Sequence, residues 1–234
     1  MNTLQYIIEP KRLWLTWQPL DEYASARTRR VVGELCHEES GEIVFHYLKD
    51  SADFQAAKLA GFKGYPAFAL HGQEIRKGVV EALMRRLPPK KREDFGEYLT
   101  QHGLPTPFQH SDFALLGYTG AKLPSDGFAL VPEFPPDEVP CDYLTEVAGL
   151  RHVFNGDISL ISVGDPVLFV ADQDNALDSD ALAIVCKGDK IGYVNRALKD
   201  TVRYWLDRHQ INASIYRLNG KPERPLAYVK ICVR

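Results

Sequence analysis

The sequence has little of several features that would narrow its class at once. Its four cysteines are scattered, with no CxxC pair and no Cys or His pair at zinc-ligand spacing, so we expect free thiols and no metal. No apolar run approaches the roughly 20 residues needed to cross a bilayer, which predicts a cytoplasmic protein without a membrane partner. With a net charge of −3, the chain also lacks the basic excess of proteins that coat duplex DNA.

What is present is an ordinary globular composition with an uneven distribution of charge. The 234 residues are 45% hydrophobic and 25% charged, enough for one large domain or two small ones. Residues 142–180 hold one basic residue against eight acidic ones, whereas residues 203–234 hold seven basic residues against two acidic ones. The two segments could pair in the fold, or they could line opposite walls of a site for one end of a charged ligand.

The first half alternates strand and helix patterns. Leu13, Leu15 and Trp17 point one way across residues 12–17, which indicates a strand. Ser111 can cap a helix that runs to about Thr119. The other expected elements are strands over 31–36, 43–47 and 127–131 and helices over 78–87 and 92–103. These patterns predict an α+β module.

A proline-rich stretch divides the chain. Residues 132–140 hold four prolines in nine positions and no periodicity, which is typical of a stiff linker. We therefore predict domains over 1–133 and 142–234, with a linker over 134–141.

The second half reads mainly as strands. They are expected over 143–154, 166–171, 181–186, 190–194, 212–218 and 226–233, with Asn219-Gly220 in the last hairpin turn. One helix over 197–209 is expected to bury Leu198, Val202, Trp205 and Leu206. The content predicts a small, mostly antiparallel, OB-like β-barrel with one or two helices.

Two motifs in this half carry a family resemblance. An acid-rich loop over 171–180 enters the strand 181–186, and Lys190-Ile-Gly-Tyr-Val-Asn-Arg196 follows at the start of a helix. Gly149-Leu-Arg151 lies upstream. In this order and separation the motifs resemble the HIRAN domain over about residues 142–234.

The resemblance implies nucleic-acid recognition, and in particular binding of the free 3′ end of single-stranded DNA without an enzymatic step or a cofactor. A carboxylate can accept a hydrogen bond from the terminal hydroxyl, while cations and rings hold phosphates and bases. The residues at the family's positions are Asp178 with its companion Asn175 for the terminus, Arg151 and Arg196 for phosphates, and Tyr193 or His152 for a base or sugar. The chain would then be a DNA-binding adaptor.

Three departures from the family pattern bear on that function. The loop has Ala176-Leu177 where the family has Pro-Tyr, and Asp180 where it has Asn. His152-Val153 stands where DNA-end readers have an aromatic pair. Since stacking contributes roughly 1–3 kcal/mol per base, fewer rings mean weaker base binding.

The same residues have simpler interpretations. The loop acids can be turn formers, Tyr193 a core residue and Arg196 a surface residue at a helix start. A calcium loop is disfavoured, because Ala176 and Leu177 fall where an oxygen ligand and a glycine should be. A metal-dependent nuclease using the acids over 172–180 is a third hypothesis.

The first half has a resemblance of its own. Val32-Gly-Glu-Leu35, Ala82–Pro88, Asp112–Gly120 and Gly127–Pro132 are similar in spacing to the N-terminal subdomain of HipA toxin kinases over about residues 12–133. We find no phosphate loop or kinase-type Asp/Asn set after residue 133. The alternative function is therefore an antitoxin-like interaction component that docks through residues 12–133 on a HipA-type kinase or regulator, which co-purification of such a partner would reveal.

Overall fold

The structure, a computed structural model, describes residues 3–20, 28–38, 40–72, 74–123, 125–176, 178–221 and 224–234. Its contacts divide the chain into two compact units. The N-terminal unit is Ile8–Pro135, and the C-terminal unit is Pro136–Arg234 together with Met1–Ile7. The bounds expected from the sequence, 1–133, 134–141 and 142–234, stay a prediction.

The N-terminal unit contains, among its described residues, a four-stranded antiparallel sheet with the order β3-β2-β1-β4. Leu13 and Leu15 are buried on one face of β1, as their alternation predicts, while Trp17 is half-buried. The strands are β1 (Arg12–Trp17), β2 (Arg30–His37), β3 (Ile43–Tyr47) and β4 (Phe128–Glu133). β1 and β3 match the expected strands and β2 contains one, while β4 overlaps the strand expected over 127–131 and ends two residues later.

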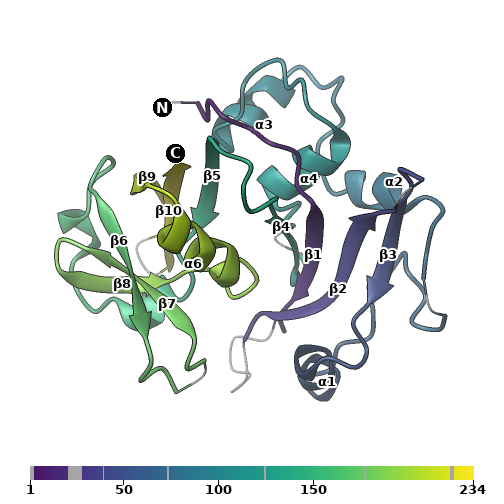
Figure 1. The fold of residues 1–234 in the computed structure, drawn as a ribbon, viewed down its shortest axis with the longest axis horizontal. Coiled ribbons are helices and arrows are strands. Elements are labelled where there is room, and N and C mark those ends of the chain that lie inside the picture. The colour runs from purple at the N-terminus through teal and green to yellow at the C-terminus, as the bar shows by residue number, and fades with distance from the viewer. Residues whose placement is uncertain are drawn as a thin grey trace. The chain divides into compact units, whose positions relative to one another are not determined.

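Four helices of the described chain accompany this sheet: α1 (Ala52–Leu59), α2 (Val79–Met84), α3 (Phe95–Gln101) and α4 (Asp112–Thr119). The Ser111 hydroxyl accepts the amide of Ala114 and begins α4 where the sequence predicts it. Helix α1 was not expected; Ser51 begins it by accepting the amide of Phe54. In Figure 1, α1 lies at one end of the sheet and α2, α3 and α4 gather toward the other.

An ion pair is enclosed in the aromatic core of this unit. The side chain of Arg86 is only 6% exposed and forms two 2.8 Å hydrogen bonds to the carboxylate of Asp126. Its Nε donates to the carbonyl of Ala121, and its guanidinium lies over the rings of Tyr65 and Phe128. Because the charge has both a counter-ion and hydrogen-bond partners, the core tolerates it.

The described strands of the C-terminal unit do not close into the barrel that the sequence predicts. Its described strands form two three-stranded antiparallel sheets, with the orders β5-β10-β9 and β6-β7-β8. Isolated bridges between Ala148 and Tyr193 and between Pro166 and Ser214 join them. The elements are β5 (Cys141–Glu146), α5 (Leu150–Val153), a 3-10 turn (Ile158–Leu160), β6 (Val167–Asp172), β7 (Ala181–Cys186), β8 (Asp189–Tyr193), α6 (Lys199–Arg208), β9 (Ile211–Lys221) and β10 (Arg224–Val233).

Two local expectations for this unit are wrong. The strand expected over 143–154 ends at Glu146, because Gly149 adopts a left-handed conformation (φ 74°) and begins the short helix α5. Asn219 and Gly220 are not the hairpin turn but are paired in the ladder with Leu226 and Pro225. Residues 222 and 223, where the connection runs, lie outside the described residues.

Helix α6 has the expected amphipathic character. Leu198 precedes it and is buried, as are Val202 and Trp205 within it, at the spacing of one helix face. Leu206 was expected to join them but is 41% exposed. It follows Trp205 directly and so lies about 100° around the helix from that buried side chain. No helix of the described chain is long and apolar enough to cross a membrane.

A buried carboxylate ties the first residues of the chain to this unit. Asp142 on β5 has a side chain that is 1% exposed; it accepts the amide of Gln5 at 2.9 Å and a guanidinium N–H of Arg234 at 2.8 Å. Burial alone would raise the pKa of Asp142, but these hydrogen bonds and the charges of Arg234 and Lys230 outweigh it and hold the pKa below its ordinary value.

Candidate functional site

The acid-rich loop between β6 and β7 is built from successive side-chain-to-backbone hydrogen bonds. The side chain of Asn175 accepts the amide of Asp178 at 3.0 Å, and the carboxylate of Asp178 accepts the amide of Asp180 at 3.1 Å. Such Asx turns explain why short polar side chains occupy these positions. Asp178 therefore forms a turn, as the simpler interpretation of the loop acids predicts, and its other contacts show that it does more. Leu177 lies outside the described residues.

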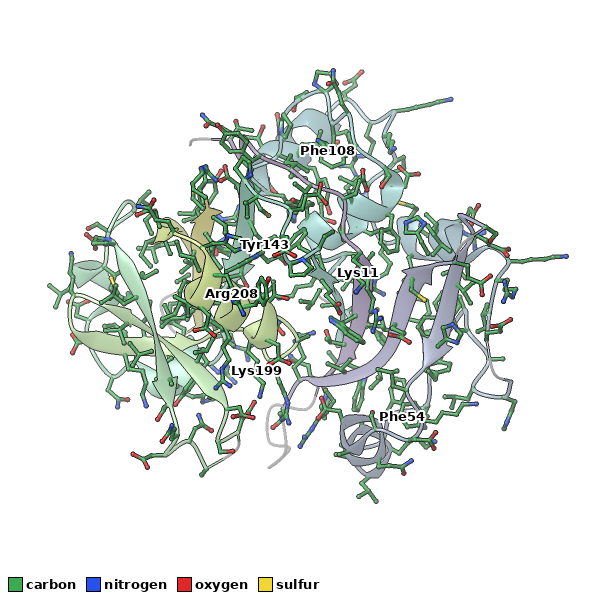
Figure 2. All side chains as sticks on the ribbon, viewed as in Figure 1. Lys11, Phe54, Phe108, Tyr143, Lys199 and Arg208 are labelled. Atoms are coloured by element: carbon green, nitrogen blue, oxygen red, sulfur yellow. The ribbon has the colours of Figure 1, made fainter. Side chains whose placement is uncertain are left out.

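The carboxylate of Asp178 is held by Lys199, the first residue of α6, and by Arg196, which lies just before that helix. Lys199 Nζ lies 2.8 Å and 3.0 Å from its two oxygens, and Arg196 Nε lies 3.8 Å from one of them. Both partners of the Asp178–Lys199 pair are largely buried, with side chains 18% and 14% exposed. Figure 2 shows Lys199 at the start of α6.

The charge state of Asp178 follows from these contacts. Burial by itself would raise the pKa of its carboxyl. The hydrogen bonds from Lys199 and from the Asp180 amide, together with the charges of Lys199 and Arg196, act in the opposite direction and leave the pKa below its ordinary value. Asp178 is therefore an ionised hydrogen-bond acceptor at neutral pH.

A second cation of α6 holds the end of the loop. Arg203 donates to the backbone carbonyl of Asp180 at 2.7 Å, and its other terminal nitrogen lies 3.5 Å from the Asp180 carboxylate. Arg203 follows Lys199 by four residues, so both lie on one face of the helix. Sequence reasoning did not identify this pair, although two cations at this spacing opposite a loop of carboxylates were a visible signal.

Tyr193 takes part in a separate hydrogen-bonded cluster. Its hydroxyl donates to Asp172 Oδ2 at 2.8 Å, and Lys190 Nζ donates to the same oxygen at 2.9 Å. Since β7 lies between β6 and β8, this contact spans the sheet. The hydrogen bonds from Lys190 and Tyr193 lower the pKa of Asp172. Tyr193 is half-buried and reaches across the sheet, so it is not a simple core residue.

A steric constraint explains why glycine precedes tyrosine in the Gly192-Tyr193 motif. The amide and carbonyl of Tyr193 both pair with Ala148, at 2.9 Å and 2.8 Å, immediately before α5. Gly192 has φ 152°, and a Cβ there would lie 2.5 Å from Val147 Cγ1 and 2.6 Å from the carbonyl oxygen of Ala148. Glycine therefore lets β8 pack against the start of α5 and brings the two motif segments together.

The expected site residues thus fall into three groups. Asn175, Asp178 and Arg196 are brought together by the loop and the start of α6. Tyr193 pairs with the segment that leads into α5. Arg151 and His152 lie on α5, where Arg151 Nε donates to His152 Nε2 at 3.0 Å. No hydrogen bond or ion pair of the described residues joins Arg151 to Asp178 or Asp180, so its assignment to phosphates stays a prediction.

The geometry defines a small antiparallel domain whose acid-rich loop is held by cations on one helix. Residues 142–229 match the family model described as HIRAN domain, so the chain contains a HIRAN domain over this range. Among solved structures, the HIRAN domain of human HLTF is similar at 18% identity, over 39% of this chain and 74% of that one, with a TM-score of 0.32. No curated protein matches the chain.

A HIRAN domain points to binding of nucleic acid, as single-stranded DNA or DNA ends. The resemblance of residues 12–133 to the HipA subdomain stays a prediction. The hypothesis of a metal-dependent nuclease assigns the loop acids to a metal ion. In the structure Asp172, Asp178 and Asp180 each contact a cationic side chain of the domain instead.

Proposed function

We propose that this chain is a non-enzymatic DNA-binding adaptor whose HIRAN domain holds the free 3′ end of a single strand. The observation that carries the proposal is the carboxylate of Asp178, which lies in the acid-rich loop of the matched domain and is held at 2.8 Å by Lys199 of α6. An ionised carboxylate is a strong acceptor for a hydroxyl, and its hydrogen bond to the terminal 3′-OH would distinguish an end from a continuous strand.

In this proposal Asn175 positions Asp178 by accepting its backbone amide. Arg196 and Arg151 hold the phosphates next to the end. His152, which is exposed on α5, and the ring of Tyr193 contact the last base or its sugar. The net charge of −3 suits a reader of one terminus better than a protein that follows many phosphates.

Fluorescence anisotropy with labelled oligonucleotides of one sequence tests the proposal. The four ligands are a linear single strand with a 3′-hydroxyl, the same strand circularised, a blunt duplex and the matching RNA. We expect the linear DNA strand to bind most tightly. Asp178→Ala should weaken that binding about tenfold or more, since hydrogen bonds to charged groups contribute about 1.5–3 kcal/mol.

Asp174→Ala is the matched control, because Asp174 is an exposed acid of the same loop. Its affinity should stay close to that of the unaltered protein. Equal binding of linear and circular strands would remove end recognition, and an unchanged affinity in Asp178→Ala would remove the assigned role of Asp178.

A further inference from the structure

Of the cations that hold the acid-rich loop, Lys199 and Arg203 have no role yet in reading the DNA end. Arg196, Lys199 and Arg203 contact the carboxylates of Asp178 and Asp180. The contacts therefore join three cations to two carboxylates. The cluster carries one net positive charge, although the loop taken alone is strongly acidic.

This balance decides which chemical end the site can accept. A 3′-phosphomonoester has a second pKa near 6 and carries nearly two negative charges at pH 7. A lone ionised carboxylate beside it would repel it, as like charges at close range do. Here the charge of Asp178 is compensated at 2.8 Å by Lys199, so the repulsion is offset within the site itself.

Lys199 also has a donor suited to a phosphate oxygen. An ammonium group has three N–H bonds, and two of those of Lys199 are directed at the oxygens of Asp178. Its nitrogen lies 4.0 Å from Asp180 Oδ2, which is beyond hydrogen-bond distance. The third N–H can therefore turn to an incoming oxygen without breaking the pair with Asp178.

Arg203 adds a second cation at the edge of this position. Its side chain is 36% exposed, and its terminal nitrogen lies 3.5 Å from the Asp180 carboxylate, a weak contact. The other terminal nitrogen donates to the backbone carbonyl of Asp180 at 2.7 Å and keeps the guanidinium in place. A phosphate oxygen is a better partner for the nitrogen at 3.5 Å than the carboxylate at that distance, because it can accept a short charge-assisted hydrogen bond.

We infer that this site accepts single strands that end in a 3′-phosphate as well as those that end in a 3′-hydroxyl, and that Lys199, supported by Arg203, sets this tolerance. The inference rests on the proposed function, since it concerns the same site. The ligand class is a single strand with a terminal 3′-phosphomonoester. This end is left when the bond between the phosphorus and the O5′ atom of the next nucleotide is broken.

The test compares two 5′-labelled strands of one sequence, one ending in a 3′-hydroxyl and one in a 3′-phosphate, with a circular strand as the ligand without an end. The quantity measured is the ratio of Kd for the phosphate end to Kd for the hydroxyl end. In the unaltered protein we expect this ratio to be about three or lower. Lys199→Gln should raise it about tenfold, the loss expected for a charged hydrogen bond.

Arg208→Gln is the matched control, because Arg208 is an exposed cation at the far end of the same helix; it should leave the ratio unchanged. If circular dichroism shows that Lys199→Gln is unfolded, Arg203→Gln takes its place, with an expected increase of about threefold.

The failure of this inference is distinguishable from that of the proposed function. A protein that binds the hydroxyl end but binds the phosphate end more than ten times more weakly overturns the inference alone. So does a ratio that stays constant in both the Lys199 and the Arg203 variants. Absence of binding to every linear strand overturns both.

Discussion

The two units use ion pairs in different ways. In the N-terminal unit, Arg86 lies among aromatic rings and donates to protein acceptors at three residues, Ala121, Asp126 and Phe128. In the HIRAN domain, the contacts described for Lys199 all go to the carboxylates of one loop. The first pair lies inside the aromatic core, whereas the second joins a surface loop to a helix.

The difference shows how the surroundings of an ion pair decide its role. A guanidinium whose donors end on backbone carbonyls and a bidentate carboxylate is part of the packing, and its removal leaves a charge and several acceptors unsatisfied. An ammonium–carboxylate pair at a loop retains hydrogen-bonding capacity that a charged ligand can use. We therefore expect substitutions in the first pair to change stability and substitutions in the second to change binding.

The largest effect is expected from breaking the Arg86–Asp126 pair. Arg86→Met should lower the free energy of unfolding of the N-terminal unit by about 3–5 kcal/mol, because Asp126 and the carbonyls of Ala121 and Phe128 lose their donor. Amide hydrogen exchange of β1 and β4 measures the loss. Arg85→Met, an exposed neighbour, should change it by about 0.5 kcal/mol or less. A loss below about 1 kcal/mol for Arg86→Met would contradict a structural role.

A smaller effect is expected from the close approach at Gly192. Gly192→Ala should destabilise the HIRAN domain by about 2–3 kcal/mol, because the new methyl group overlaps the backbone of Ala148. Urea denaturation followed by Trp205 fluorescence, with Trp14 and Trp17 replaced by Phe, measures the change. Gly188→Ala is the matched control: its φ is also positive (91°), but no atom lies within 4 Å of the new methyl group, so only about 1–2 kcal/mol should be lost.

The smallest effect is expected in the pH dependence of stability, to which the buried carboxylate of Asp142 contributes. The folded-state pKa of Asp142 is held below its ordinary value, so the stability it contributes is present above the unfolded pKa of about 3.9 and is lost as the pH falls through the folded pKa. Below about pH 4 the unaltered protein should lose stability more steeply than Asp142→Asn, in the same fluorescence measurement. Equal slopes for the two proteins would exclude this linkage.

Much of the strand content was predictable from local pattern. Strands β1, β3 and β7 begin and end at the residues expected, because their apolar side chains alternate or run continuously between turn residues. Helix α4 was located by its serine cap. Helix α5 was missed because Gly149 interrupts an apolar segment that otherwise reads as one strand, and only its backbone conformation shows that the chain turns there.

The candidate site was predictable in part. Asn175 and Asp178 could be named because the loop motif itself resembles a family. The partner of Asp178 could not be named in this way, because Lys199 lies 21 residues further along the chain, at the start of a helix. Arg151 and Arg196 were both named for phosphates, and the structure adds their protein contacts, with Arg196 3.8 Å from Asp178 and Arg151 in a hydrogen bond with His152.

The order of residues alone determined the division of polar and apolar positions, the caps and turns, and the loop and Gly-Tyr motifs of the HIRAN domain. These depend on neighbours within a few positions, whose spacing is fixed by the backbone geometry of helices and strands. Tertiary structure decided which charges meet, that two sheets form instead of a closed barrel, and that Asp178 is compensated by Lys199. Such contacts join distant segments, and their energies depend on burial and on distances that exist only once the chain has folded.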